Sequence, residues 1–160
     1  MVRTLAGSTL WIDMQAFALR RIELLGRRFG RRRRLAEHLA TGERGEREAL
    51  FHLRKHGYIV VARRWRTPKL RGDIDLIAWE NDWLCFIEVK TRSERDAMSP
   101  AEAAVDDDKK RMLRRMARVY LRSFPERSRR EIPVRFDVIS VYLESDQPEF
   151  DLYRGVFGWE

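Results

Sequence analysis

The sequence has little cysteine, little histidine and no long apolar run, and each shortage excludes a class of protein. Its 160 residues include one cysteine, Cys85, so no internal disulfide can form and a disulfide-stapled secreted fold is excluded. We therefore expect a reducing compartment, the cytoplasm. The three histidines, His38, His52 and His56, have no further ligand beside them at zinc-site spacing. Charged residues interrupt the apolar stretch near the N-terminus, so we expect no transmembrane segment.

What the chain does have is a hydrophobic core and an excess of positive charge. Hydrophobic residues make up 44% of the chain, which suits one ordinary domain and excludes a fully disordered chain. Lys and Arg number 33 against 25 Asp and Glu, which gives a net charge of +8 and a pI near 10.2. This balance is typical of proteins that bind nucleic acid or anionic membranes, and also of proteins with a merely basic surface.

Most of this charge lies in the first 40 residues, which hold nine arginines and three acidic residues. Residues 41–160 hold 24 basic and 22 acidic residues and are nearly balanced. We therefore divide the chain into a basic N-terminal extension, residues 1–40, and a domain, residues 41–160. The extension has helical periodicity over residues 10–22. Three interpretations stay open: an arm on nucleic acid, an amphipathic helix on anionic lipid, or a loosely ordered extension.

From residue 41 the hydrophobic pattern alternates between helix and strand. We expect helices over 46–53 and 109–122, a linker or short helix over 99–105, a basic loop over 63–71, and strands over 58–62, 73–79, 83–91, 134–143 and 150–157. This order predicts an α/β fold: a mixed sheet with a hairpin in its middle and helices at its sides.

The central hairpin brings two carboxylates together. If residues 81–82 form a two-residue turn, counting back from it places Asp75 opposite Glu88, on the same face as Lys90. Like charges that face each other destabilise a sheet, but a divalent cation between them would stabilise this pair. Mg²⁺ prefers one or two carboxylates together with waters and phosphate oxygens. A structural lysine that bridges the two acids, or a register slip that separates them, would explain the same residues.

Basic residues gather on both sides of this hairpin. Residues 54–71 include seven basic and no acidic residues, and residues 109–130 include ten basic and one acidic residue. In the second segment the arginines share one helical face, which suits a phosphate backbone or simply solvent. The acidic triplet 106–108 before this helix is better explained as a helix cap than as a metal site. Glu46 lies on the inward face of its helix, where a pair with an arginine at the edge would be ordinary.

Three motifs, in this order, resemble one family. They are Gly42-x-x-Gly45-Glu46-x-x-Ala49, Gly72-Asp73-Ile74-Asp75-Leu76-Ile77 and Phe86-Ile87-Glu88-Val89-Lys90-Thr91-Arg92. They are similar to the YraN-like family of predicted bacterial endonucleases. That family belongs to the PD-(D/E)XK superfamily, whose restriction-endonuclease-like fold it shares with archaeal Holliday-junction resolvases. The similarity covers residues 40–157, and Asp73 departs from it, because the family usually has Glu there.

The resemblance implies a fold and a role for individual residues. The fold would be a restriction-endonuclease-like mixed sheet with flanking helices. Asp75 and Glu88 would bind Mg²⁺ or Mn²⁺, Lys90 would be the lysine of the superfamily motif, and Glu46 would complete the metal or water shell. These four residues form the predicted catalytic set. The predicted nucleic-acid contacts are Arg71, Arg92, Lys109, Arg111, Arg114, Arg115 and Arg118.

Residues and resemblance together predict a Mg²⁺-dependent endodeoxyribonuclease that acts on structured or branched DNA in repair, recombination or processing. RNA is not excluded as a substrate. A resolvase activity would need two active sites and hence a homodimer. Two alternatives stay open: a non-catalytic nucleic-acid-binding module on the same fold, and an interaction or regulatory protein whose acids are structural.

Overall fold

The computed structural model describes residues 37–92, 105–143 and 147–159. The predicted helix over residues 10–22 lies outside the described residues, and so does all but the last residue of the predicted segment 99–105. Residues 41–160 form one compact unit, and this unit contains every strand of the described chain.

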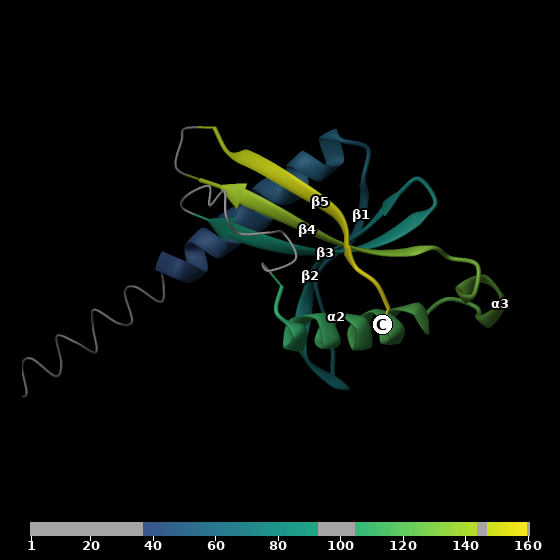
Figure 1. The fold of residues 1–160 in the computed structure, drawn as a ribbon. Coiled ribbons are helices and arrows are strands. Elements are labelled where there is room, and N and C mark those ends of the chain that lie inside the picture. Colours follow the sequence, from purple (N-terminus) through teal and green to yellow (C-terminus); the bar gives the residue numbers. More distant parts are fainter. Residues whose placement is uncertain (1–36, 93–104, 144–146, 160) are drawn as a thin grey trace, which may run out of the picture. The chain divides into compact units, whose positions relative to one another are not determined.

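A five-stranded sheet is the centre of this unit (Figure 1). In sheet order, which is also the sequence order, its strands are β1 (Ile59–Thr67), β2 (Leu70–Glu80), β3 (Trp83–Arg92), β4 (Val134–Tyr142) and β5 (Glu149–Phe157). The strands β3 and β4 pair in parallel, and all other neighbours pair antiparallel. A parallel pair needs a crossover connection, which here contains α2 (Asp107–Leu121) and the short α3 (Glu126–Arg129). The predicted α/β fold is confirmed, and the arrangement is consistent with a restriction-endonuclease-like fold.

Helices cover both faces of the sheet. On one face α2 packs Met116 against Phe86 of β3. On the other face lies the stretch 41–55 of the helix that spans residues 37–55, and its Ala49 and Leu53 pack against the sheet. Because both faces are covered, the central strands β2 and β3 are nearly continuous runs of apolar residues. The charged side chains within these two strands therefore need a particular explanation.

The register of the β2–β3 hairpin agrees with the predicted turn. Asn81 adopts a positive φ of 52°, and Glu80 pairs with Trp83 across the turn. From there the antiparallel ladder continues to the pair Leu76 and Ile87. The turn thus sets which residues of β2 and β3 lie side by side.

The predicted basic loop over residues 63–71 is wrong. The strand β1 continues to Thr67 and β2 begins at Leu70, so only residues 68–69 turn between them. Because β1 is an edge strand, it tolerates the exposed Arg63 and Arg66 on either side of Trp65, which packs toward the core. The dense positive charge of this segment is typical of a loop, although its backbone forms a strand.

The acidic triplet before α2 caps the helix, as predicted. The Asp106 side chain is the N-cap and accepts a hydrogen bond from the backbone N–H of Lys109 at 2.7 Å. Asp107 and Asp108 lie in the first turn, where their negative charge interacts favourably with the positive end of the helix dipole. The cap fixes the first turn of α2, and with it the start of the Lys109 side chain.

Candidate functional site

Asp75 and Glu88 lie just beyond the point where the β2–β3 ladder ends. The last regular pair is Leu76 with Ile87. At the next position of β2, the Asp75 side chain takes the place of a backbone acceptor. Its Oδ2 accepts a hydrogen bond from the backbone N–H of Val89 at 2.8 Å. The two strands begin to diverge here, which leaves room for polar groups between them. The structure therefore brings the two predicted acids together, although not as a regular ladder pair.

Two ammonium groups contact Glu88, which is only 4% exposed. Nζ of Lys90 is 3.1 Å from Oε1, and Nζ of Lys109 is 2.8 Å from Oε2. Lys109 lies at ion-pair distance but lacks hydrogen-bond alignment, so Oε2 has no hydrogen-bond donor among the described residues. We call Asp75, Glu88, Lys90 and Lys109 the acid–lysine cluster. The buried Oε2 is thus held by an ion pair without an aligned hydrogen-bond donor, which is unusual in a folded protein.

Asp75 is an unusually weak acid. Burial, and after it the charge of Glu88, raises the pKa of Asp75 to about 7, against the opposing effects of the Val89 hydrogen bond and Lys109. Burial disfavours the charge on Lys109 as well, but attraction to Glu88 and Asp75 outweighs it, so the pKa of Lys109 is raised. Near neutral pH Lys109 therefore keeps its ammonium charge while Asp75 is partly protonated. A buried acid with a raised pKa is typical of functional sites.

Glu46 lies near the cluster but is bound to another residue. Nε of Arg64 is 2.6 Å from its Oε2, and Nη2 of Arg64 is 3.1 Å from its Oε1. This is the arginine pair at the edge of the helix that the sequence left open. The pKa of Asp75, raised mainly by burial and Glu88, is raised further by Glu46. No three Asp, Glu, His or Cys side chains gather as a metal-ligand set within the described ranges.

Gly45 sets the place of Glu46. A Cβ atom at position 45 would clash with Oγ1 of Thr91 on β3 and would also lie 3.0 Å from its Cβ, which leaves no room for a side chain unless Thr91 moves. Glycine alone lets the helix approach β3 at the end of the strand that carries Lys90. The Gly-Glu pair of the first sequence motif therefore has a packing reason.

The two carboxylates fit a hard divalent cation. Mg²⁺ is usually held by one or two carboxylates, with waters and phosphate oxygens completing its coordination. Asp75 and Glu88 supply those carboxylates, and Oε2 of Glu88 could accept a cation in place of the Lys109 ammonium that now lies 2.8 Å from it. A cation would also relieve the repulsion that raises the pKa of Asp75.

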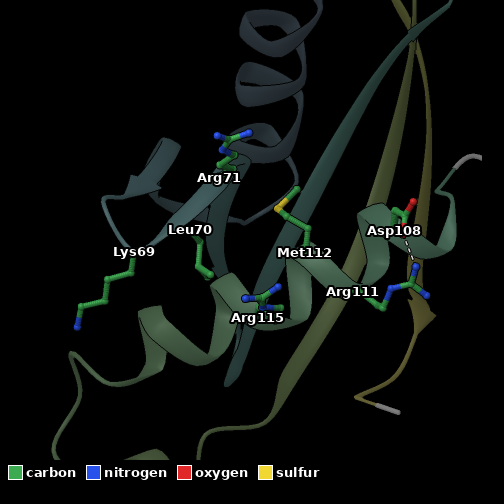
Figure 2. Close-up of a pocket in the computed structure, with 7 residues that line it drawn as sticks. All are labelled: Lys69, Leu70, Arg71, Asp108, Arg111, Met112 and Arg115. Atoms are coloured by element: carbon green, nitrogen blue, oxygen red, sulfur yellow. Dashed lines mark hydrogen bonds and ion pairs between the residues drawn. The ribbon is translucent and has the colours of Figure 1, made fainter.

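Some of the predicted phosphate contacts line one groove (Figure 2). Arg71, Arg111 and Arg115 meet there, together with Lys69, in a hollow of about 440 Å³ between the β1–β2 turn and α2. Arg111 forms an ion pair with Asp108. No acidic partner of Lys69, Arg71 or Arg115 lies within the part of the chain that the structure describes. The sequence does not predict the role of Lys69, because its place in the groove depends on how the β1–β2 turn packs beside α2.

Arg114 and Arg118 contact the C-terminal end of the described chain. Nε of Arg114 donates to the carbonyl oxygen of Gly158 at 2.7 Å, and its guanidinium lies 5.3 Å from the ring centre of Phe157. The guanidinium of Arg118 lies 5.5 Å from the ring centre of Trp159. These two arginines thus already stabilise the fold, although both also line a second hollow of about 450 Å³.

The two remaining predicted contacts lie outside the groove. Lys109 contacts Glu88, as described, and belongs to the acid–lysine cluster. Arg92 ends β3 and is half-buried, and its Nε has no hydrogen-bond acceptor among the described residues. Five of the seven predicted contacts therefore line two hollows that share Arg111 and Arg115, and Lys109 and Arg92 line neither.

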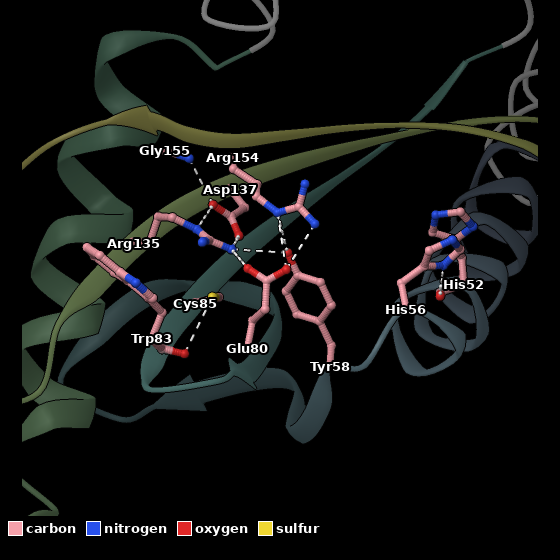
Figure 3. Close-up of polar contacts among 10 residues, drawn as sticks. All are labelled: His52, His56, Tyr58, Glu80, Trp83, Cys85, Arg135, Asp137, Arg154 and Gly155. Atoms are coloured by element: carbon pink, nitrogen blue, oxygen red, sulfur yellow. Dashed lines mark hydrogen bonds and ion pairs between the residues drawn. The ribbon is translucent and has the colours of Figure 1, made fainter.

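A second buried cluster of charges lies near the hairpin turn (Figure 3). Arg135 donates to the buried Asp137 from Nε at 2.7 Å and from Nη2 at 2.9 Å, and its Nη2 also lies 2.5 Å from Glu80. Arg154 donates to Glu80 at 2.9 Å. Both arginines donate to the Tyr58 hydroxyl, at 3.0 and 3.1 Å. We call these five residues the arginine network. Its charges pair with one another, so its geometry is that of a structural element.

The domain that carries both clusters is similar to one family of proteins. The model of a family described as "Uncharacterised protein family UPF0102" matches residues 45–141. The chain belongs to this family. A UPF0102 protein of Koribacter versatilis (strain Ellin345) is 52% identical over 121 residues, which cover 76% of this chain and 81% of that protein. A UPF0102 protein of Solibacter usitatus (strain Ellin6076) is 43% identical over 130 residues, which cover 79% and 91%.

Membership of UPF0102 agrees with the YraN-like resemblance. The matched range contains Glu46, the acid–lysine cluster and the groove of Figure 2. The family is described as uncharacterised, so membership assigns no activity to the acid–lysine cluster. In the described part of the chain, no helix combines the length and the apolar character needed to cross a membrane.

Proposed function

We propose that this protein is a divalent-metal-dependent endodeoxyribonuclease that hydrolyses phosphodiester bonds in structured or branched DNA. The observation that carries the proposal is the acid–lysine cluster, in which two carboxylates and two ammonium groups meet where β2 and β3 diverge. Metal-dependent hydrolysis of a phosphodiester in DNA uses a bound cation, a group that stabilises negative charge and a basic surface for the polyanion. The cluster and the adjoining groove offer residues for all three.

Asp75 and Glu88 would hold Mg²⁺ or Mn²⁺. When bound, the ion would polarise the scissile phosphate and lower the pKa of a water. Asp75 has to release its proton to contribute a charged ligand, and its pKa of about 7 lets it do so near neutral pH. Lys90 follows Glu88 on β3 and is held 3.1 Å from Oε1, so its ammonium would orient the attacking water and neutralise charge in the transition state. Glu46 would orient a further water of the shell once Arg64 releases it.

DNA phosphates would bind in the groove between the β1–β2 turn and α2. Lys69, Arg71 and Arg115 present cations there that have no acidic partner within the described residues. Unpaired cations on rigid elements suit a phosphate backbone, because each phosphate contact releases counterions from the DNA. The contacts carry no base readout, so they favour selection by DNA structure over selection by sequence.

Cleavage of branched, flapped and linear DNA by the purified protein tests the proposal. Cleavage should require Mg²⁺ or Mn²⁺ and should fall at least about 100-fold in Asp75→Asn and in Lys90→Ala, since each removes charge stabilisation from the transition state. Arg130→Ala is a matched surface control, because the ion pair of Arg130 among the described residues is with the exposed Glu126 at 3.5 Å. Circular dichroism should show folded variants. Nuclease activity that survives both substitutions would contradict the assignment.

A non-catalytic binding module on the same fold gives a different result. It binds DNA in a salt-dependent manner without any metal requirement, and Lys90→Ala leaves it unchanged. Under either function, Arg71→Ala and Arg115→Ala should each reduce the slope of log K against log salt by about one. Turnover therefore separates the two functions. The same assay with RNA, and light scattering of the protein with and without a four-way junction, test an RNA substrate and a homodimer.

A further inference from the structure

The two lysines that contact Glu88 come from different parts of the fold. Lys90 lies two residues along the same strand, so it stays beside Glu88 whatever the rest of the protein does. Lys109 comes from the first turn of α2, which the Asp106 cap holds in place. Its 2.8 Å contact with Oε2 of Glu88 is therefore a tertiary contact between α2 and the sheet.

Lys109 also sets the charge of the cluster. With all four groups ionised, Asp75, Glu88, Lys90 and Lys109 sum to zero, and without Lys109 they sum to −1. The Lys109 side chain is 23% exposed and that of Glu88 is 6% exposed, so water screens the pair poorly. A carboxylate this deeply buried requires a counter-charge.

We propose that Lys109 is an internal counter-ion that holds Glu88 in the metal-free protein, and that its ammonium leaves Oε2 when a divalent cation binds. The inference rests on the proposed function, because it concerns the same two carboxylates. Mg²⁺ binds carboxylate oxygen at about 2.0–2.1 Å, and an ammonium 2.8 Å from that oxygen would repel it. Lys109 therefore weakens the binding of the metal to the free protein.

The displaced ammonium would remain on the first turn of α2, one residue from Asp108 at the edge of the groove of Figure 2. A DNA phosphate bound in that groove would give it a new anionic partner. Binding of the metal and binding of DNA would then favour each other through Lys109, because each binds better when the ammonium has left Glu88.

Calorimetric titration with Mn²⁺ alone, without DNA, tests the role of Lys109. Lys109→Met keeps the length of the side chain and removes its charge, and we expect it to bind Mn²⁺ at least tenfold more tightly than the unmodified protein. Lys110→Met is the matched control, because Lys110 is the next residue of α2 and its ammonium pairs with the exposed Asp107 at 3.6 Å. It should bind Mn²⁺ within twofold of the unmodified protein. Asp75→Asn added to Lys109→Met should abolish the binding.

Thermal unfolding of the metal-free proteins gives a second readout. Lys109→Met leaves a buried carboxylate pair with one lysine, so its Tm should fall by about 5 °C or more, and saturating Mn²⁺ should recover the loss. Lys110→Met should melt like the unmodified protein. If Lys109→Met does not fold, the double variant Glu88→Gln/Lys109→Met, which removes both charges, should fold and melt near Glu88→Gln.

The outcomes separate this inference from the proposed function. If the unmodified protein binds Mn²⁺ and Lys109→Met binds it equally or more weakly, the counter-ion role is overturned and the metal site stands. If neither the unmodified protein nor any lysine variant binds Mn²⁺, the metal site is overturned, and the counter-ion role with it. Additive effects of Glu88→Gln and Lys109→Met on Tm would also overturn the role, because they would show no coupling between the two residues.

Discussion

The acid–lysine cluster lies where the β2–β3 ladder ends, whereas the arginine network joins Glu80 of β2 to Tyr58 and to residues of β4 and β5, and the charged groups of the two are partnered to different degrees. In the network, Asp137 accepts two bonds from Arg135 and one from the N–H of Gly155 at 2.9 Å. Burial would raise the pKa of Glu80, but its bonds to arginines outweigh burial and lower it. In the cluster, Asp75 has one backbone donor and a pKa raised to about 7.

This difference indicates the task of each group. Charges that hold a fold together gain most when every donor and acceptor is used, because an unpaired buried charge destabilises the protein. Charges that bind a ligand need capacity left over for it. The network therefore holds strands of the sheet together, and the cluster, in which the Lys109 ammonium is the partner of Oε2 that a cation could replace, suits a bound ion.

The largest effect should come from removing the centre of the network. Arg135→Ala leaves Asp137 and Glu80 buried without their shared partner, and we expect it to lower the free energy of unfolding by about 3–5 kcal/mol. Urea unfolding measures the change. Arg130→Ala, at the exposed C-cap of α3, should stay within about 0.5 kcal/mol of the unmodified protein. If Arg135→Ala lowers the free energy of unfolding only slightly, the arginine network does not hold the fold together.

In the acid–lysine cluster, removing a charged group should raise the free energy of unfolding instead of lowering it. Because the pKa of Asp75 is raised in the folded state, folding favours its proton, and the metal-free protein loses stability as the pH rises from about 4 to about 7. Asp75→Asn removes this loss and can still accept from the N–H of Val89. It should be more stable than the unmodified protein by about 2 kcal/mol at pH 8 and equal to it near pH 4. Thermal unfolding at a series of pH values measures this. A variant that is less stable at pH 8 would assign Asp75 to structure.

The smallest effect is expected for Glu80. Its contribution to stability is lost as the pH falls, whereas that of Asp75 is lost as the pH rises. The pKa of Glu80 is lowered in the folded state, so its contribution to stability is present above its ordinary value near 4.5 and is lost as the pH falls through the folded pKa. Glu80→Gln should lower the free energy of unfolding by about 1 kcal/mol at pH 7, because Arg154 is half exposed. The gap should close below pH 4. A gap that is constant with pH would show that the charge of Glu80 does not matter.

The local parts of the site could be predicted from the sequence, and the long-range parts could not. A two-residue turn sets the register of its own hairpin, which is why the sequence correctly predicts that Asp75 and Glu88 lie together. The contact between Lys109 and Glu88 depends on the path of the crossover and on the seating of α2, which no local pattern encodes. The position of Lys109 among the arginines of α2 favours a DNA contact instead.

The distinction between local and long-range contacts also explains why the sequence does not predict the second half of β1 or the arginine network. The second half of β1 has the sequence pattern of a loop, because its arginines follow the needs of a sheet edge and not those of a buried strand. The arginine network has no signal in the sequence, because Tyr58, Glu80, Arg135 and Arg154 are far apart along the chain. Each of these residues has an ordinary local pattern, and only the sheet brings them together.

The arginines of β1 have a consequence for how two molecules of this protein behave toward each other. An open sheet edge can pair with the edge of a second copy and start aggregation. Arg63, Arg64 and Arg66 are exposed along this edge; Arg64 pairs with Glu46 and Arg66 with Asp73, so the charge left over is that of Arg63, and it repels the same edge of a second copy. A bound polyanion would neutralise this repulsion. Colloidal stability would then be lowest in stoichiometric mixtures with nucleic acid at low salt, and added salt would redissolve the protein by releasing the polyanion.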